Sequence, residues 1–363
     1  MRFIFYSPVN FEKWDWRNSV EGGIGGSETS HVEMAWRLAR RGHEVITYAS
    51  IPDDCPGEWR GTQWRPLEEV DFSLTGVWVL YRCPSVLDKF SVPHEGQTLW
   101  LVHQDWDYPT LVGDRVTRLD KMLVLCDWHK RYTLQRHPEL EGKVLVTSNG
   151  LKLDLLESVE VEGIRRNPKK LVYASSPDRG LQYLLPIFER AREFDSDLEL
   201  HTFYGFNNID KFPDTAPYYF IKKVKEDVMK YDGKPGIFFH GRVSQPELYR
   251  HWFSAGIWCY PTNFQETSCI TSMEAQAMGA IPITHPVAAL SENVHWGAFV
   301  HGDAYGDPLA HARYVAEIVR WADPLLQETV RPKMMADARG RFNWETFVDQ
   351  WESEAEVAGG VRT

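Results

Sequence analysis

Residues 257–284 of the chain read IWCYPTNFQETSCITSMEAQAMGAIPIT. Ile257–Tyr260 is a short apolar run that predicts a strand, and residues 270–278 predict a helix. Ile281–Thr284 is a second apolar run and predicts another strand. Because short strands that alternate with helices are typical of a parallel sheet covered by helices, this stretch predicts an α/β fold.

The same alternation extends on both sides of this stretch. The sequence predicts strands at 170–174, 198–203 and 236–240 and helices at 180–193, 218–230, 245–254 and 309–322. The sequence therefore predicts that the second half of the chain forms one open, helix-covered sheet.

The first 150 residues show the alternation independently. Strands at 2–6 and 44–49 flank a helix at 27–41, which Ser27 is expected to cap and Gly42 to end. Further strands are expected at 76–81, 98–103, 121–125 and 143–147, and a helix at 128–137. Open sheets bind ligands at the carboxyl ends of their strands, so two sheets with facing edges would share one cleft.

A change of pattern after residue 150 divides the chain. The polar and charged stretch that follows reads as a linker, and we expect domains at 1–160 and 161–343. A final helix is expected at 344–357, with an apolar face formed by Trp344, Phe347, Val348 and Trp351. Since that face must pack on something, we expect residues 344–363 to cross back and complete the first domain.

Composition limits the class of protein. The 363 residues are 43% hydrophobic and 25% charged, which is ordinary for a globular protein of two domains. The start lacks signal-peptide features and no apolar run reaches bilayer length, so we expect a cytoplasmic protein that touches a membrane at most peripherally. A net charge of −11 argues against nucleic acid as a partner. Five scattered cysteines argue against disulfides or a structural zinc site.

A glycine-rich loop, Gly22-Gly23-Ile24-Gly25-Gly26, precedes the first predicted helix. Gly25 and Gly26 allow close backbone approach, and the helix start offers N–H groups to a phosphate; a flexible turn is the alternative. Glu28 stands where a dinucleotide fingerprint needs a small residue, which argues against NAD or FAD.

Glu266 lies in the loop after the strand at 257–260, and Glu274 lies on the following helix. Eight helical residues would separate them by about 12 Å, which excludes the close carboxylate pair of a glycosidase. The two carboxylates suit hydroxyl groups at two ends of a long ligand, such as a sugar and a ribose. The N–H groups of Thr267, Ser268 and Cys269 are expected to point at the same ligand.

Two further segments supply polar groups at strand ends. Ser175, Ser176 and Arg179 follow the strand at 170–174, and hydroxyls with an arginine at a helix start suit a diphosphate; a surface turn is the alternative. His103 ends the strand at 98–103, where it would contact a reacting sugar or move a proton, or serve as a structural histidine.

Together these motifs resemble the GT-B glycosyltransferases of the large retaining group usually called family 4. The resemblance covers most of the chain. It rests on Gly25-Gly26-Ser27-Glu28, residues 40–45, His103, Ser148-Asn149-Gly150, His240-Gly241-Arg242-Val243-Ser244, the E-x7-E from Glu266 to Glu274, and residues 277–282.

The resemblance implies a role for each motif. Glu266 would bind hydroxyls of the donor sugar, Glu274 the ribose, Arg179 the diphosphate, and Arg242 with Val243 the base.

On the same grounds His103 would lie near the donor sugar, and Gly25 or Gly26 would approach the phosphate. Many relatives carry a second basic residue at the diphosphate, where this chain has Ser175 or Ser176.

The implied activity is transfer of a sugar from a nucleoside-diphosphate sugar to a hydroxyl acceptor, with retention of configuration and without a cofactor. Asp105-Trp106-Asp107 has the D-x-D form by which another class of glycosyltransferases holds a metal, but the double-sheet plan differs from that class, so no metal is expected. A nucleotide-sugar epimerase or hydrolase, or a non-catalytic nucleotide-sugar-binding protein, remains the alternative.

Overall fold

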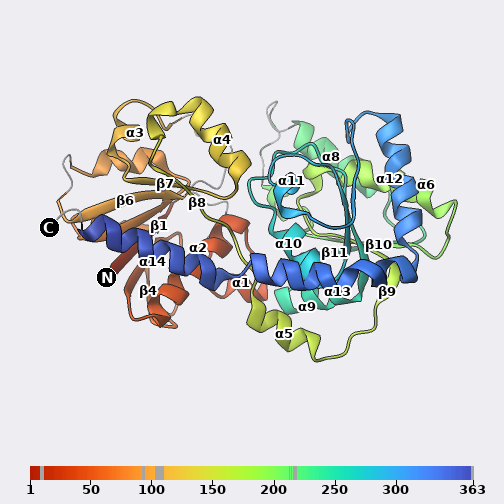
Figure 1. The fold of residues 1–363 in the computed structure, drawn as a ribbon, viewed down its shortest axis with the longest axis horizontal. Helices are drawn as coiled ribbons and strands as arrows, with labels where there is room; N and C mark the ends of the chain where they lie inside the picture. The colour runs from red at the N-terminus through yellow and green to blue at the C-terminus, as the bar shows by residue number, and fades with distance from the viewer. Residues whose placement is uncertain are drawn as a thin grey trace. The chain divides into compact units, whose positions relative to one another are not determined.

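The computed structural model describes residues 1–8, 12–91, 95–102, 110–211, 213, 215 and 219–360. The chain divides into two compact units (Figure 1). Unit 1 comprises Met1–Gly150 and Asn343–Thr363, and unit 2 comprises Leu151–Phe342. The sequence predicts this boundary about ten residues later, at 160.

Unit 1 contains a sheet in the order β3-β4-β2-β1-β5-β6-β7-β8. All neighbours pair in parallel except β3 with β4. The strands are β1 (Arg2–Ser7), β2 (Glu44–Ala49), β3 (Glu58–Trp59), β4 (Thr62–Pro66), β5 (Gly76–Tyr81), β6 (Gln97–Val102), β7 (Lys121–Val124) and β8 (Val144–Val146). The helices are α1 (Asn18–Glu21), α2 (Gly26–Arg40), α3 (Asp114–Arg118), α4 (Asp127–Arg136) and α14 (Trp344–Gly360).

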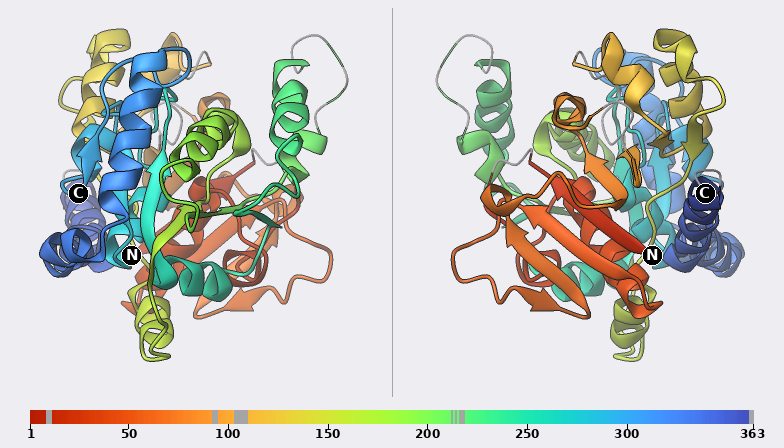
Figure 2. Two further views of the ribbon diagram at one scale, coloured as in Figure 1. Left: turned by 90° about the vertical axis from the view of Figure 1, so that its right-hand side faces the viewer. Right: turned by 90° about the vertical axis from the view of Figure 1, so that its left-hand side faces the viewer.

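Unit 2 contains a second sheet, in the order β11-β10-β9-β12-β13-β14, in which every pair is parallel. Its strands are β9 (Asn167–Tyr173), β10 (Glu199–Phe203), β11 (Ile237–Gly241), β12 (Ala255–Tyr260), β13 (Ile281–Thr284) and β14 (Ala298–Phe299). Its helices are α5 (Leu153–Glu160), α6 (Leu181–Arg192), α7 (Asn207–Asp210), α8 (Tyr219–Met229), α9 (Gln245–Ser254), α10 (Ile270–Ala277), α11 (Leu290–Asn293), α12 (Pro308–Trp321) and α13 (Pro324–Arg341). Helix α6 packs against α12, and α5 against α9 (Figures 1 and 2).

Most predicted strands and helices are confirmed to within one or two residues, because their apolar periodicity matches the buried faces. Three details are wrong. Residues 151–160 do not form a linker: Leu156 and Val159 are buried, and α5 is part of the unit 2 core. Helix α13, the shorter helices α1, α3, α7 and α11, and the strands β3, β4 and β14 were not predicted. Ser27 lies inside α2, whose N-cap residue is Gly25.

The last helix, α14, packs against α2, as its apolar face predicts. Trp344, Val348 and Trp351 are buried in one cluster with β1, β5 and β6. Trp351 Nε1 donates to Thr147 Oγ1 at 3.1 Å. The end of the chain therefore completes the core of unit 1.

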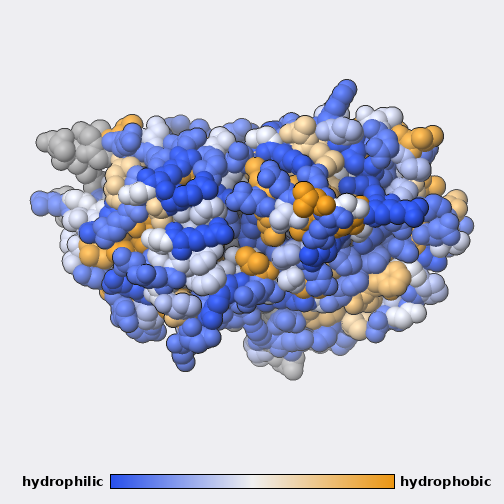
Figure 3. Space-filling view, turned by 90° about the horizontal axis from the view of Figure 1, so that it is seen from below, coloured by the Kyte–Doolittle hydropathy of each residue, from blue (hydrophilic) through white to orange (hydrophobic). Residues whose placement is uncertain are grey.

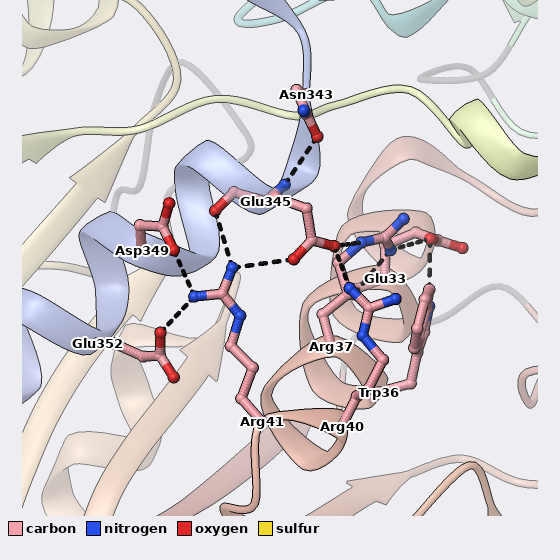
Figure 4. A network of polar contacts seen from close by, with 9 residues as sticks. All are labelled: Glu33, Trp36, Arg37, Arg40, Arg41, Asn343, Glu345, Asp349 and Glu352. Atoms are coloured by element: carbon pink, nitrogen blue, oxygen red, sulfur yellow. Dashed lines mark hydrogen bonds and ion pairs between the residues drawn. The ribbon is translucent and has the colours of Figure 1, made fainter.

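An ion-pair network holds α14 to the end of α2 (Figure 4). Glu345 accepts hydrogen bonds from Arg37 at 3.1 Å, Arg40 at 2.6 Å and Arg41 at 2.9 Å. Arg41 also contacts Glu352. Because one carboxylate bridges three guanidinium groups, these pairs form one connected unit rather than isolated surface pairs.

No disulfide bond joins any two of the five cysteines, all of which are among the described residues. Among the described residues no helix combines the length and apolar character needed to cross a membrane. The face drawn in Figure 3 is mostly hydrophilic, with hydrophobic residues in small separate groups.

Replacing Glu345 by alanine tests the network. The substitution removes three charged hydrogen bonds and should lower the free energy of unfolding by about 2 kcal/mol. Asp349→Ala, which removes one contact to Arg41 from a carboxylate that is 68% exposed, should cost less than about 0.5 kcal/mol. Urea unfolding of the full chain measures both; equal losses in the two variants would contradict the special position of Glu345.

Candidate functional site

The strand order of unit 2 reverses direction between β9 and β12. From β9 the chain runs outward through β10 to β11, and then returns to place β12 on the other side of β9. The loops that follow β9 and β12 therefore leave the sheet in opposite directions. Ligands of open α/β sheets bind at this kind of switch point, outside the carboxyl ends of the strands.

Arg179 and Glu266, from these two loops, contact each other. Arg179 Nη1 lies 3.1 Å from Glu266 Oε1 and 3.3 Å from Oε2. The hydroxyl of Tyr260 donates to Glu266 Oε1 at 2.7 Å, and the Arg179 guanidinium lies 4.2 Å from the ring centre of Phe264. The Glu266 side chain is 9% exposed and that of Arg179 is 36% exposed. A buried carboxylate thus lies beside a cation that still reaches solvent.

Gly180 makes this contact possible. Its φ of +129° is unfavourable for other residues, and a Cβ atom there would overlap the backbone carbonyl of Pro261. The loop after β9 therefore touches the loop after β12 directly behind Arg179. A side chain at position 180 would push the two loops apart.

The two serines differ in their contacts. Ser175 is buried, and its Oγ lies 3.2 Å from Thr271 Oγ1 in the first turn of α10. Ser176 Oγ donates to Asp178, and its carbonyl accepts from the Tyr173 hydroxyl at 2.8 Å. Ser175 thus faces the start of α10, whereas the Ser176 hydroxyl holds its own turn.

Thr267, Ser268 and Cys269 lead directly into α10. Cys269 is the N-cap residue and has a left-handed backbone, with φ +61°, and no described side chain caps this helix. The carbonyl of Ser268 accepts from Asn293 Nδ2. A non-glycine residue in this conformation is strained, and such strain is found preferentially at binding sites. Burial raises the pKa of the Cys269 thiol to about 12, so it is protonated at neutral pH.

Glu274 is buried further along α10. Gln245 Nε2 donates to its Oε1 at 3.2 Å, and Lys152 Nζ in turn donates to Gln245 Oε1 at 2.6 Å. Burial raises the pKa of Glu274 to about 7, although Tyr249 and Lys152 oppose the shift. A carboxyl group with this pKa changes charge in the physiological range.

Arg242 and Val243 follow β11, two strands away from β9 in the sheet. The guanidinium of Arg242 lies 5.9 Å from the ring centre of Tyr204, in the loop after β10. Gly205 lies so close to Gly241 that a Cβ there would be 3.3 Å from the Gly241 Cα. The loops after β10 and β11 therefore meet at the same edge of the sheet as Arg179 and Glu266.

Gly25 and Gly26 belong to unit 1, where α2 begins after β1. The carboxylate of Glu28 lies against Gly25 and occupies the space that a side chain at 25 would need. The start of α2 thus already carries an acidic group. His103 and Asp105-Trp106-Asp107 lie outside the described residues.

Sequence reasoning missed the partners of the two glutamates. Tyr260 was noticed only as the end of a strand, yet it holds Glu266; Gln245 and Lys152, which hold Glu274, come from distant elements. The position of Tyr260 at the carboxyl end of a central strand is the sequence feature that could have indicated its contact with Glu266.

No family model matches the chain. A lipopolysaccharide 1,2-N-acetylglucosaminetransferase of Salmonella typhimurium is 22% identical over 245 residues. The match spans 60% of this chain and 62% of that relative.

Solved structures resemble the chain over nearly its whole length. A glycosyltransferase from Rickettsia africae has a TM-score of 0.74 at 13% identity, covering 98% of this chain and 97% of that one. Sucrose-phosphate synthase from Thermosynechococcus elongatus has a TM-score of 0.74 at 14% identity, covering 99% of each chain. Anabaena HepE, solved with UDP and glucose, has a TM-score of 0.66 at 12% identity, covering 98% of this chain and 100% of that one. The chain therefore has the GT-B fold, as the sequence predicts.

Proposed function

We propose that the protein is a glycosyltransferase that moves a sugar from a nucleoside-diphosphate sugar to a sugar or other small hydroxyl acceptor. The Arg179–Glu266 pair at the β9–β12 switch point carries this proposal. It combines a cation for a diphosphate with a carboxylate for sugar hydroxyls at the position where α/β sheets bind ligands. The GT-B fold and the N-acetylglucosaminetransferase relative support the same activity.

When a donor binds, Arg179 and Glu266 would give up their contact with each other and bind the donor instead. The diphosphate accepts hydrogen bonds from Arg179, whose side chain is 36% exposed, and the sugar hydroxyls donate to Glu266. Glu266 keeps its hydrogen bond from Tyr260, so its orientation is retained. In the free protein each charged group neutralises the other, which avoids an unpaired buried carboxylate.

The chemical step follows from the charge that develops on the leaving group. The bond between the anomeric carbon and the diphosphate oxygen breaks, and the acceptor oxygen bonds to that carbon while its proton passes to the departing phosphate. Arg179 and the N–H groups at the start of α10 stabilise the phosphate charge, so no metal is required. Attack on the face that the diphosphate leaves retains configuration. The protonated Cys269 is unsuited to act as a nucleophile.

Glu274 would accept hydrogen bonds from the ribose hydroxyls, and Arg242 with Val243 would contact the base. His103 would lie beside the donor sugar, and Gly25 with Gly26 beside the phosphate. The relative's N-acetylglucosamine specificity and the UDP and glucose of the HepE complex make UDP-sugars the first donors to test.

A thermal-shift screen tests the donor site. UDP-sugars, or GDP-, ADP- or TDP-sugars in their place, should raise the melting temperature, because a ligand that binds only the native state stabilises it. The difference in melting temperature between samples with and without nucleotide should remain when EDTA is added. No shift with any nucleotide would refute the donor site, and a shift abolished by EDTA would refute metal independence.

Replacing Glu266 by glutamine tests catalysis. The variant keeps the shape of the side chain but loses the charge, and should lose roughly 10- to 100-fold in transfer rate. Glu193→Gln, an exposed carboxylate at the end of α6, is the matched control and should retain full activity. Product analysis distinguishes the alternatives: release of free sugar without transfer to any acceptor indicates a hydrolase, and an altered nucleotide sugar an epimerase.

Glu274 predicts a pH dependence of donor affinity. The ionised carboxylate accepts hydrogen bonds from both ribose hydroxyls, so affinity for a nucleotide sugar should fall as the pH drops below about 7. Isothermal titration between pH 8 and pH 6 measures the change, and Glu274→Gln should flatten it. An unchanged pH profile in that variant would exclude Glu274 as its source.

The raised pKa of Glu274 also predicts that the free energy of unfolding decreases as the pH rises. Its folded pKa of about 7 lies above the ordinary value of 4.5, so the stability it contributes is complete below pH 4.5 and is lost as the pH rises through 7. This shift corresponds to about 3 kcal/mol. The free energy of unfolding of Glu274→Gln minus that of wild type should therefore be more positive at pH 8 than at pH 5. Urea unfolding at the two pH values measures this difference.

A further inference from the structure

Three histidines from separate elements of unit 2 meet beside the edge strand of its sheet. His201 lies on β10, His240 on β11 and His251 on α9. One ring nitrogen from each residue can be chosen so that all three lie within 4.8 Å of one another. His240 is exposed and the other two are half-buried, so the cluster is open to solvent on one side.

The fold places the three rings on one face. Strands β10 and β11 are parallel neighbours in which His201 pairs with Phe238, and their register shifts at His240, which has no paired residue on β10. The His240 ring nevertheless stacks on the His201 ring, with the ring centres 5.1 Å apart. Helix α9 packs against β9, the next strand of the sheet. Phe203 stacks on His240 with the ring centres 4.6 Å apart, and Phe238 stacks on His201 with the ring centres 4.7 Å apart.

One ring nitrogen of the cluster has no hydrogen-bond partner among the described residues. His201 Nδ1 lies 2.9 Å from His240 Nε2. His201 Nε2 is buried without a hydrogen-bond partner, because the nearest carboxylate oxygen, on Glu199, is 3.5 Å away. Lys170 Nζ contacts His251 Nδ1 at 2.9 Å and Ser254 Oγ at 2.7 Å.

The surroundings of the cluster lower the pKa of all three imidazoles. Burial and Lys170 lower the pKa of His201 to about 3 and that of His251 to about 4. Burial also lowers the pKa of His240.

We propose that His201, His240 and His251 bind a divalent transition-metal ion of the zinc class. Three imidazole nitrogens are a set of ligands that Zn²⁺ accepts, with water in the fourth position. Ring nitrogens bound to one Zn²⁺ lie about 3.4 Å apart, so the widest separation here must close by roughly 1.4 Å, which side-chain rotation provides. Glu199 then becomes the outer carboxylate that orients His201.

The ion would act on the structure rather than in the sugar transfer. His240 and His251 flank the segment 241–244, which contains Arg242 and Val243, so a shared ion ties the edge strand to α9 across that loop. Arg179 and Glu266 belong to other loops and are not ligands of this ion. The metal site and the proposed glycosyltransferase activity can therefore fail independently.

Metal analysis of the untagged, chelator-treated full chain tests the proposal. After equilibrium dialysis against Zn²⁺, wild type should hold about one ion per chain. His240→Gln and His251→Gln should each weaken binding by more than the roughly 10- to 100-fold that loss of an outer partner costs. His301→Ala, an exposed histidine of the same unit, should bind as wild type does.

X-ray absorption of the zinc-loaded wild type gives a second measurement that does not depend on a variant folding. Three imidazole ligands are expected. Zn²⁺ should also raise the melting temperature of wild type but not of His240→Gln. Failure of wild type to retain zinc, a ligand count of one or two imidazoles, or undiminished binding by both glutamine variants would overturn the site.

Discussion

The contact between the loops after β9 and β12 is the constraint on which the site depends. Gly180 has no side chain, and only for that reason can its backbone lie against the carbonyl of Pro261. Arg179 and Glu266 are then near enough to pair, and the buried carboxylate of Glu266 is compensated. Gly180, which carries no functional group, is thus the residue that lets Arg179 and Glu266 come together.

The two glutamates are held in different ways. Glu266 is neutralised by a cation and oriented by Tyr260. Glu274 receives polar contacts from α9 and stays near the point of protonation, because burial is only partly offset. One carboxylate is therefore paired with a cation, whereas the charge of the other depends on pH. The sequence predicts that Glu266 and Glu274 lie too far apart to form a close carboxylate pair. Their positions agree with this, since Glu266 precedes α10 and Glu274 lies within it.

The sequence predicts the sheets well because their strands are short apolar runs, and β12, α10 and β13 occur within two residues of their expected positions. It fails where local pattern and tertiary structure diverge. Leu156 and Val159 stand in a polar stretch that conceals α5. Contacts such as Lys152 with Gln245 join residues far apart in the chain, which no local spacing encodes. The clustering of His201, His240 and His251 is not predicted for the same reason.

The return of α14 to unit 1 has a consequence for the order of events during synthesis. All residues of unit 2 leave the ribosome before Trp344, Val348 and Trp351 become available to the core of unit 1. Domains fold largely as units while the chain is made. Residues 1–150 therefore cannot complete their core until α14 has been synthesised, and unit 2 is the first of the two units that can reach its complete core.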